Sequence, residues 1–265
     1  MKRLWDSFSD ILGATIFHPQ FFAKKYAREA VEEAVRQAKG RILDIGCGRA
    51  PYRALFEDFS AKKPDVSRLN HSGSGSRSSR KTQYVTLDHP EVAKRYLKDF
   101  TPDILADVSK GIPVGDRSFD TVLLLMVLEH LPKPAQVIAE VRRILKPGGK
   151  VIVSTVQTYP LHDEPYDFFR YTKYGLRSLL QEAGLRVTKV EVRGNLFTTT
   201  ATNLNTGIYQ LIKTLTKPVI LLPFALILGL AYLPISWFLN IVAYVLSPLD
   251  TIGRYRHSLW VVGQK

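Results

Sequence analysis

The sequence predicts an α/β fold, in which a doubly wound, seven-stranded sheet carries helices on both faces and a hydrophobic helical insertion precedes the last strand. Short apolar runs alternate with longer segments rich in helix formers, which is typical of strands joined by crossover helices. A second observation is the uncharged run at 218–249, which lies between the last two predicted strands. With 265 residues, 45% hydrophobic and 23% charged, the chain can bury a real core, which excludes a disordered or fibrous protein.

The order of the elements follows from hydrophobic periodicity and from glycine and proline signals. Gly40 and Gly184 mark helix ends, and Pro134 suits the first turn of a helix. The alternation of elements predicts a parallel sheet. We expect strands at 41–45, 84–87, 103–108, 119–126, 150–156, 185–192 and 258–263, and helices at 20–39, 50–59, 91–99, 134–145 and 172–183.

Four regions result: N-terminal helices at 1–40, a core at 41–195, a hydrophobic helical insertion at 196–250, and the last core strand at 251–265. If that strand joins the same sheet, both ends of the insertion lie on one side of any membrane. A single crossing is then excluded, and a helical hairpin or an in-plane wedge remains.

The run at 218–249 is long enough to cross a bilayer, since about 20 apolar residues suffice. Pro223 and Pro234 predict its division into pieces of about 10–14 residues, a length typical of re-entrant or interfacial segments. Trp237 and Tyr232 suit an interface. The alternative is a buried helical pair in a soluble core or a dimer interface.

The N-terminus and the overall charge bear on location. Asp6 and Asp10 interrupt any signal-peptide core, so we expect no signal peptide; the apolar face at 4–16 predicts a helix that packs on its own domain or lies on a membrane. The net charge of +13 favours nucleic acid, an anionic membrane surface or an acidic substrate. The Gly/Ser-rich stretch at 60–81 predicts a solvated loop.

The single cysteine, Cys47, excludes an intramolecular disulfide and a four-cysteine zinc site, and fits a reducing compartment. We expect no bound metal. The predicted location is the cytoplasmic face of a membrane.

Polar residues follow the predicted strands where ligands bind in an open parallel sheet. Asp44 and the Gly46-Cys47-Gly48 turn end the first strand, and Asp88 ends the second. An acid at the second strand can accept both ribose hydroxyls, and an acid at the third, Asp107, can accept from an adenine amino group. The pattern predicts a nucleoside site.

The glycine turn does not match a dinucleotide fingerprint, which reads G-x-G-x-x-G, because Pro51 stands where the third glycine would be. The Asp44 carboxylate beside the turn suits a cationic ligand better than a pyrophosphate. S-adenosylmethionine carries an ammonium and a sulfonium and no phosphate.

The sequence here resembles the class I S-adenosylmethionine-dependent methyltransferases, which are Rossmann-like, and especially the group that includes quinone and sterol methyltransferases (methyltransferase type 11). The resemblance covers roughly 25–195 and the last strand, and leaves out the insertion. The matching segments, in order, are LDIGCG at 43–48, Asp88, ADVSKGIPVGDRSFDTV at 106–122, VLEHLPKP at 127–134, VRRILKPGGKVIVST at 141–155 and HDEPYDFFRYTKYGLRSLLQEAGL at 162–185.

The resemblance implies a set of cofactor-binding residues. The methionine end would be held by Asp44 and the backbone of the Gly46-Cys47-Gly48 turn, and the ribose by Asp88. Asp107 and the Val108 backbone would hold adenine, and Met126 would line the cofactor floor. Ala50 departs from the family, which has a third glycine there.

An acceptor hydroxyl or carbon also needs a base. His130, after the central strand, and His162 and Tyr166, after the fifth, are the candidate catalytic residues, with His162 preferred. Asp163, Arg170 and Tyr171 are candidates for an acceptor pocket or lid. The alternatives are a structural His130 and a loop pinned by Arg170 and Asp167.

The predicted function is S-adenosylmethionine-dependent methyl transfer to a lipidic or lipid-linked acceptor at a membrane surface. Plausible acceptors are a quinone precursor, a polyprenyl-linked sugar or another lipid headgroup. A methyltransferase acting on RNA or a soluble small molecule is one alternative, although no RNA-binding module is evident. A non-catalytic membrane scaffold with the same fold is another.

Overall fold

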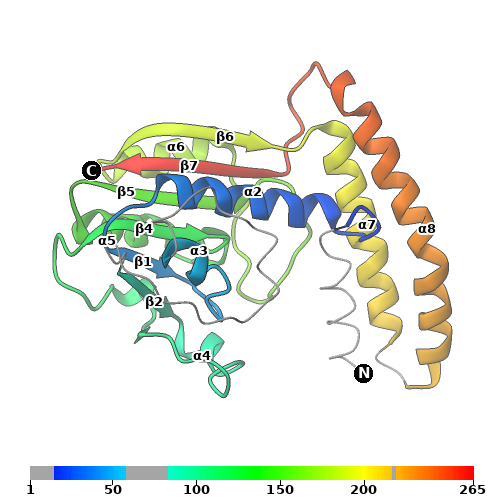
Figure 1. The fold of residues 1–265 in the computed structure, drawn as a ribbon, viewed down its shortest axis with the longest axis horizontal. Coiled ribbons are helices and arrows are strands. Elements are labelled where there is room, and N and C mark those ends of the chain that lie inside the picture. The colour runs from blue at the N-terminus through cyan, green and yellow to red at the C-terminus, as the bar shows by residue number, and fades with distance from the viewer. Residues whose placement is uncertain (1–14, 58–82, 217–218) are drawn as a thin grey trace. The chain divides into compact units, whose positions relative to one another are not determined.

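The computed structural model describes residues 15–57, 83–216 and 219–265 (Figure 1). The chain forms two compact units. The sheet unit comprises Glu29–Thr155, Asp163–Glu191 and Leu259–Lys265, and the hairpin unit comprises Met1–Arg28, Val156–His162 and Val192–Ser258. The helix predicted at 4–16, apart from its last two residues, and the loop predicted at 60–81 lie outside the described residues.

The predicted seven-stranded sheet is confirmed, with the strand order β3-β2-β1-β4-β5-β7-β6. The four residues of β1 are all buried, as a central strand covered on both faces requires. The strands are β1 Ile42–Ile45, β2 Tyr84–Asp88, β3 Ile104–Leu105, β4 Phe119–Leu125, β5 Leu145–Val156, β6 Arg186–Arg193 and β7 Ser258–Gln264.

Helices cover both faces of the sheet. Figure 1 shows α2 and α3 on the near side, where Ala34, Val35 and Phe56 pack in one core with β-strand residues such as Trp260. On the far side lies α6, which contacts α5. These helices are α2 Phe21–Gln37, α3 Arg53–Glu57, α4 Pro90–Ala93, α5 Pro134–Ile144 and α6 Lys173–Glu182, with short 3₁₀ turns η2 Val108–Lys110 and η3 Leu128–His130.

Two elements are shorter than predicted. The helix expected at 91–99 is regular only over α4, and hydrogen-bonded turns continue to Phe100. The strand expected at 103–108 is reduced to β3, because the Asp107 carboxylate accepts the Ser109 N–H and starts η2. A side chain that bonds to the local backbone in this way competes with strand pairing.

The prediction of a wholly parallel sheet is wrong for β7. Gly148 N–H donates to Lys265 O at 3.0 Å, whereas Gln157 N–H donates to His257 O at 2.9 Å, so β5 and β7 run in opposite directions. Figure 1 likewise shows the β7 arrow opposed to β6. A single crossover helix carries the chain back to the end of the sheet where the previous strand began, so the next strand is parallel to it. Two antiparallel helices bring the chain back to the end where the previous strand finished, so the next strand runs in the opposite direction.

Those two helices are α7 Leu196–Leu215 and α8 Leu222–Leu246. The start of α7 is hydrogen-bonded to the residues that follow α8. The Leu196 N–H donates to Asp250 Oδ2 at 2.9 Å, and the Asn195 amide donates to Ser247 O at 3.4 Å. The His257 N–H donates to Arg193 O at 2.8 Å just beyond. The chain therefore leaves and re-enters through adjacent positions.

The predicted division of the apolar run by proline is also wrong. Pro223 lies in the first turn of α8, where its missing N–H has no helical partner to lose. Pro234 lies inside the helix, which nevertheless continues to Leu246. Among the described residues, one helical segment, Leu222–Leu249, is long and apolar enough to cross a membrane.

Candidate functional site

The glycine turn after β1 is hydrogen-bonded to the end of β2. The Gly46 and Cys47 N–H groups donate to Leu87 O at 2.8 and 3.2 Å, and the Gly48 N–H donates to Asp88 Oδ2 at 2.8 Å. Parallel pairing of Ile45 with Leu87 sets the two strand ends level. The structure thus brings together the predicted residues of the first two strand ends.

Glycine is required at Gly46 for two reasons. Its φ of 72° lies in the left-handed region, and a Cβ there would stand 2.4 Å from Val127 Cγ2. At Gly48, with a φ of 55°, a Cβ would meet no atom of the described residues within 4 Å, so this side of the turn is open in that part of the structure. Ala50 has a φ of 49°, in the left-handed region, which explains why the family that the sequence resembles has glycine at this position. An alanine in this conformation costs about 1 kcal/mol.

The Asp44 carboxylate is buried at the end of β1. Its Oδ2 accepts the Tyr84 hydroxyl at 2.5 Å. Burial raises the pKa of Asp44 to about 7, the nearby Asp88 adds to this, and the Tyr84 hydrogen bond opposes it. The protein therefore keeps an acidic group near its ionisation point at the sheet edge, in a place suited to a cation.

The Asp88 carboxylate is also buried, and groups of the chain itself already donate to most of its acceptor positions. Oδ2 accepts both the Gly48 N–H and the Tyr96 hydroxyl, the latter at 2.5 Å, and Oδ1 accepts the His89 N–H at 2.7 Å. A carboxylate offers about four acceptor positions. Counting the described residues, these hydrogen bonds fill three positions, and one position on Oδ1 remains.

Asp107 caps η2 beyond β3. Its Oδ1 accepts the Ser109 N–H and hydroxyl at 3.0 and 2.6 Å, and these bonds help hold the pKa of Asp107 below its usual range. Oδ2 lies 3.4 Å from Lys110 Nζ. Val108 is buried directly behind it. Met126, with a φ of 59°, turns the chain at the end of β4, and its N–H donates to Ser154 O.

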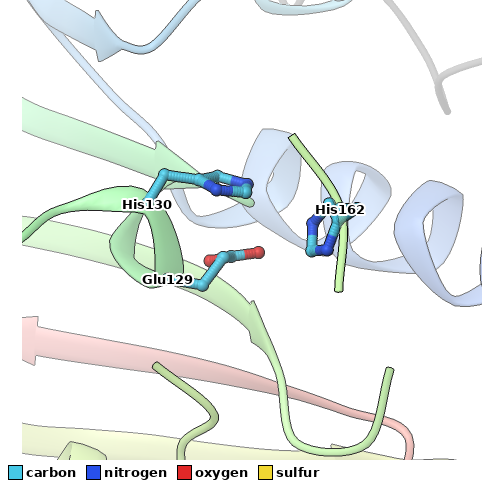
Figure 2. A group of neighbouring side chains, drawn as sticks. All are labelled: Glu129, His130 and His162. Carbon is cyan, nitrogen blue, oxygen red and sulfur yellow. The ribbon is translucent and has the colours of Figure 1, made fainter. Parts of the chain in front are cut away.

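Glu129 and His130 lie on the η3 turn after β4, and Figure 2 shows both side chains. Glu129 is fully buried and accepts the Thr155 hydroxyl at 2.8 Å. His130 Nδ1 lies 2.6 Å from Tyr166 O. Since a carbonyl only accepts, Nδ1 carries the proton, which makes Nε2 the basic nitrogen of the neutral ring.

The segment predicted as a lid is bound to this turn. The Phe168 and Phe169 N–H groups donate to Glu129 O at 2.9 and 3.2 Å, and the Tyr171 hydroxyl donates to Leu128 O at 3.4 Å. Sequence reasoning gave Glu129 no role. A charged residue immediately after the most hydrophobic strand was the available signal, because a buried acid needs fixed partners.

Arg170 and Asp167 form a bidentate pair with both N···O distances at 2.6 Å, and the Asp167 side chain is 1% exposed. This agrees with the alternative that the pair pins the loop. Asp163 instead lies 3.7 Å from Arg95, on the surface. The aromatic rings of Tyr166 and Phe168 are about half exposed and line the outside of the segment.

His162 belongs to the hairpin unit, whereas the other predicted site residues belong to the sheet unit. Its Nδ1 lies 3.1 Å from Pro160 O, so here too Nε2 is the basic nitrogen of the neutral ring. The ring packs edge-on against Tyr159 at 5.2 Å.

Comparison with known proteins identifies the class. Residues 19–190 match the family model of a methyltransferase domain, which is well over half of the chain, so the protein belongs to this family. The resemblance to class I S-adenosylmethionine-dependent methyltransferases is confirmed at the level of the family.

Among curated relatives, the ubiquinone biosynthesis O-methyltransferase of Dechloromonas aromatica is 27% identical over 158 residues, which are 60% of each chain. The demethylmenaquinone methyltransferase of Renibacterium salmoninarum is 30% identical over 155 residues, 57% of this chain and 55% of that one. The chain thus spans about 60% of the first of these relatives.

A similar solved structure is an S-adenosylmethionine-dependent methyltransferase from Archaeoglobus fulgidus. It has a TM-score of 0.50 and 16% identity, and the match covers 90% of this chain and 94% of that one. At this identity the likeness concerns the fold.

The raised pKa of Asp44 predicts a pH-dependent stability. Because the folded protein holds this proton up to a pKa of about 7, against an ordinary value of 3.8, the Asp44 contribution is full at low pH and is lost as pH rises from about 4 to 7. The full difference corresponds to about 4 kcal/mol. Asp44→Asn should remove this decline, as measured by denaturant unfolding between pH 4 and 8.

The difference in stability between the wild type and Asp44→Asn, taken at each pH, gives the contribution of Asp44 alone. Burial lowers the pKa of His18 and of His257 to about 4, so both change stability in the opposite direction over the same range in either protein. Parallel stability profiles for the wild type and Asp44→Asn would contradict the raised pKa.

Proposed function

We propose that the protein transfers a methyl group from S-adenosylmethionine to a lipophilic small molecule, of the quinone or sterol kind, at a membrane surface. The observation that carries the proposal is the pair of buried carboxylates, Asp44 and Asp88, beside a glycine turn that is open at Gly48. The relatives named for ubiquinone and menaquinone biosynthesis support the class of acceptor.

The residues at this edge fit the cofactor. The Asp44 carboxylate provides a counter-ion for an ammonium group, and a cation there favours the ionised form of a group whose pKa is about 7. Asp88 has one acceptor position left for a ribose hydroxyl, and the Asp107 side chain and Val108 backbone follow at the next strand end. Bound S-adenosylmethionine supplies an already activated methyl group, so this chain contributes positioning and exclusion of water.

A base completes the chemistry when the acceptor atom carries a proton. Bound S-adenosylmethionine would supply the methyl group to the acceptor oxygen, nitrogen or carbon, and the proton that the acceptor gives up would pass to the base. His130 and His162 each hold Nδ1–H against a backbone carbonyl, which presents Nε2 in the accepting form. Tyr166 contributes its carbonyl to the orientation of His130 and an exposed ring for an apolar acceptor.

A membrane location agrees with the apolar acceptor. The exposed rings of Tyr166, Phe168 and Phe169 provide an apolar surface in the segment after β5. The segment Leu222–Leu249 provides the anchor. The intracellular supply of the cofactor and the free Cys47, which suits a reducing compartment, support a position on the cytoplasmic face.

The proposal is tested by transfer of labelled methyl from S-adenosylmethionine in the presence of purified protein and total membranes, followed by separation into organic-extractable, protein and nucleic-acid fractions. Label in the organic fraction supports the proposal, and Asp44→Asn serves as the inactive control. Label confined to RNA supports the alternative that the +13 charge favours. Cofactor binding without transfer to any fraction supports the non-catalytic alternative.

Asp88 and Tyr96 give a prediction for cofactor binding. Asp88→Ala should weaken S-adenosylmethionine binding by about 1–3 kcal/mol, because a ribose hydroxyl loses its acceptor. Tyr96→Phe frees a position on Oδ2 and should leave the affinity equal or higher. Calorimetric titration measures both; a loss for Tyr96→Phe as large as that for Asp88→Ala would show that the tyrosine supports the site rather than competing for it.

The two histidines give a prediction for turnover. Loss of a positioned base lowers the rate by about 10²-fold or more. His162→Ala should therefore lower the rate of transfer to the extracted lipid while the dissociation constant of the cofactor stays within about twofold. His130→Ala, measured alongside, identifies which ring is the base. Equal transfer rates in the wild type and both variants would leave both as structural residues.

A further inference from the structure

In the α7–α8 hairpin, polar side chains are buried and large apolar side chains are exposed, which is the opposite of the usual distribution in a soluble protein. Many of the buried side chains on the two helices are polar, and they lie beside small residues such as Ala201, Ala225 and Ala243. The Asn205 amide donates to Asn240 Oδ1 at 3.0 Å, and the Tyr232 hydroxyl donates to Asn205 Oδ1 at 2.5 Å. Other buried polar residues on these two helices are Thr198, Thr199, Thr202, Thr206 and Ser236.

The outward side of α8 is apolar and exposed. Ile227 and Val245 are each 65% exposed and Phe238 is 60% exposed, which is unusual for large side chains in water. The buried positions of α8 recur every three or four residues, at Ala225, Gly229, Tyr232, Ser236, Asn240 and Ala243, so the exposed apolar side chains share the other side of the helix. This face comprises Phe224, Ile227, Leu230, Ile235, Phe238 and Val245.

Charges are confined to the two ends of the hairpin. The stretches 196–212 and 218–249 contain none. Lys213 lies in the last turn of α7, beside the connection to α8. At the opposite end lie Arg193, Asp250 and Arg254.

The lengths match a bilayer. At 1.5 Å per residue, the 20 residues of α7 and the 25 residues of α8 extend about 30 and 37 Å, against a hydrocarbon core of about 30 Å. Among the described helices α8 alone is apolar enough to cross by itself, so α7 would cross as its partner, joined to it by the Asn205–Asn240 hydrogen bond. Hydrogen bonds of this kind are one of the forces that hold helices together in lipid.

We propose that the α7–α8 hairpin crosses the whole bilayer, with the turn after Lys213 in the far headgroup layer and both outer ends on the side of the methyltransferase sheet. This rests on the proposed membrane location and adds the topology. A helix that lies in the plane of the membrane needs a charged face toward water. Neither α7 nor α8 has one, since the single charged side chain in the two helices is Lys213, in the last turn of α7.

The experiment compares two matched variants, Thr214→Cys at the tip and Thr251→Cys at the base, both at exposed positions. The only native cysteine, Cys47, is buried and gives the background. The full chain is inserted into sealed vesicles of phosphatidylcholine and phosphatidylglycerol, and vesicles with the sheet unit outside are treated with a membrane-impermeant maleimide. Detergent-permeabilised vesicles give full labelling.

The expected result is that Thr251→Cys is labelled in intact vesicles, whereas Thr214→Cys is labelled only after permeabilisation. Labelling of both cysteines in intact vesicles, with the protein resistant to carbonate extraction, would overturn the spanning topology and leave the membrane location and the methyl transfer in place. Release of the protein by carbonate would overturn the membrane location together with the topology, while the transfer assay separately decides the chemistry.

Discussion

Parallel hydrogen bonding between β1 and its neighbours β2 and β4 determines where the polar groups of the candidate site lie. Ile45 is paired with Leu87 on one side and with Leu124 on the other, so three loops leave the sheet at one level. The Leu87 carbonyl then accepts two N–H groups of the glycine turn. Because these loops cannot separate without breaking strand pairing, the site is held in place by the most buried part of the sheet, before any ligand binds.

This arrangement places two carboxylates out of water at one edge, which is unfavourable unless each is compensated. Each accepts one tyrosine hydroxyl, Tyr84 for Asp44 and Tyr96 for Asp88. A hydroxyl stabilises a carboxylate less than a cation does, and the pKa of Asp44 accordingly remains raised to about 7. The cationic ligand that we propose for this edge would supply the missing positive charge. The tyrosines thus hold the free protein together at positions where a ligand gains by replacing or supplementing them.

The sequence predicted the strands, the helices and the residues at the strand ends, because hydrophobic period and turn residues are local signals. It did not predict Tyr84 or Tyr96 as partners of the carboxylates, because a hydrogen bond between Tyr84 and Asp44 joins residues 40 positions apart. The direction of β7 escaped prediction for a similar reason, since it depends on the pairing of α7 with α8. Pro234 was taken as a break, but helix packing outweighs the loss of one backbone hydrogen bond.

The two units solve the burial of polar groups in opposite ways. In the sheet unit, apolar side chains such as Leu123 and Val153 are fully buried, and the charged groups are at the edge or the surface. In the hairpin unit, Asn205 and Asn240 are fully buried while large apolar side chains are exposed. The first arrangement is stable in water, because it removes apolar area from contact with the solvent. In lipid, burial of apolar side chains gives no such gain in free energy, and unpaired polar groups are the main cost, so the second arrangement is the stable one there. The membrane location that we propose would give each arrangement its own solvent, and the proposed apolar acceptor would come from one of them and the cofactor from the other.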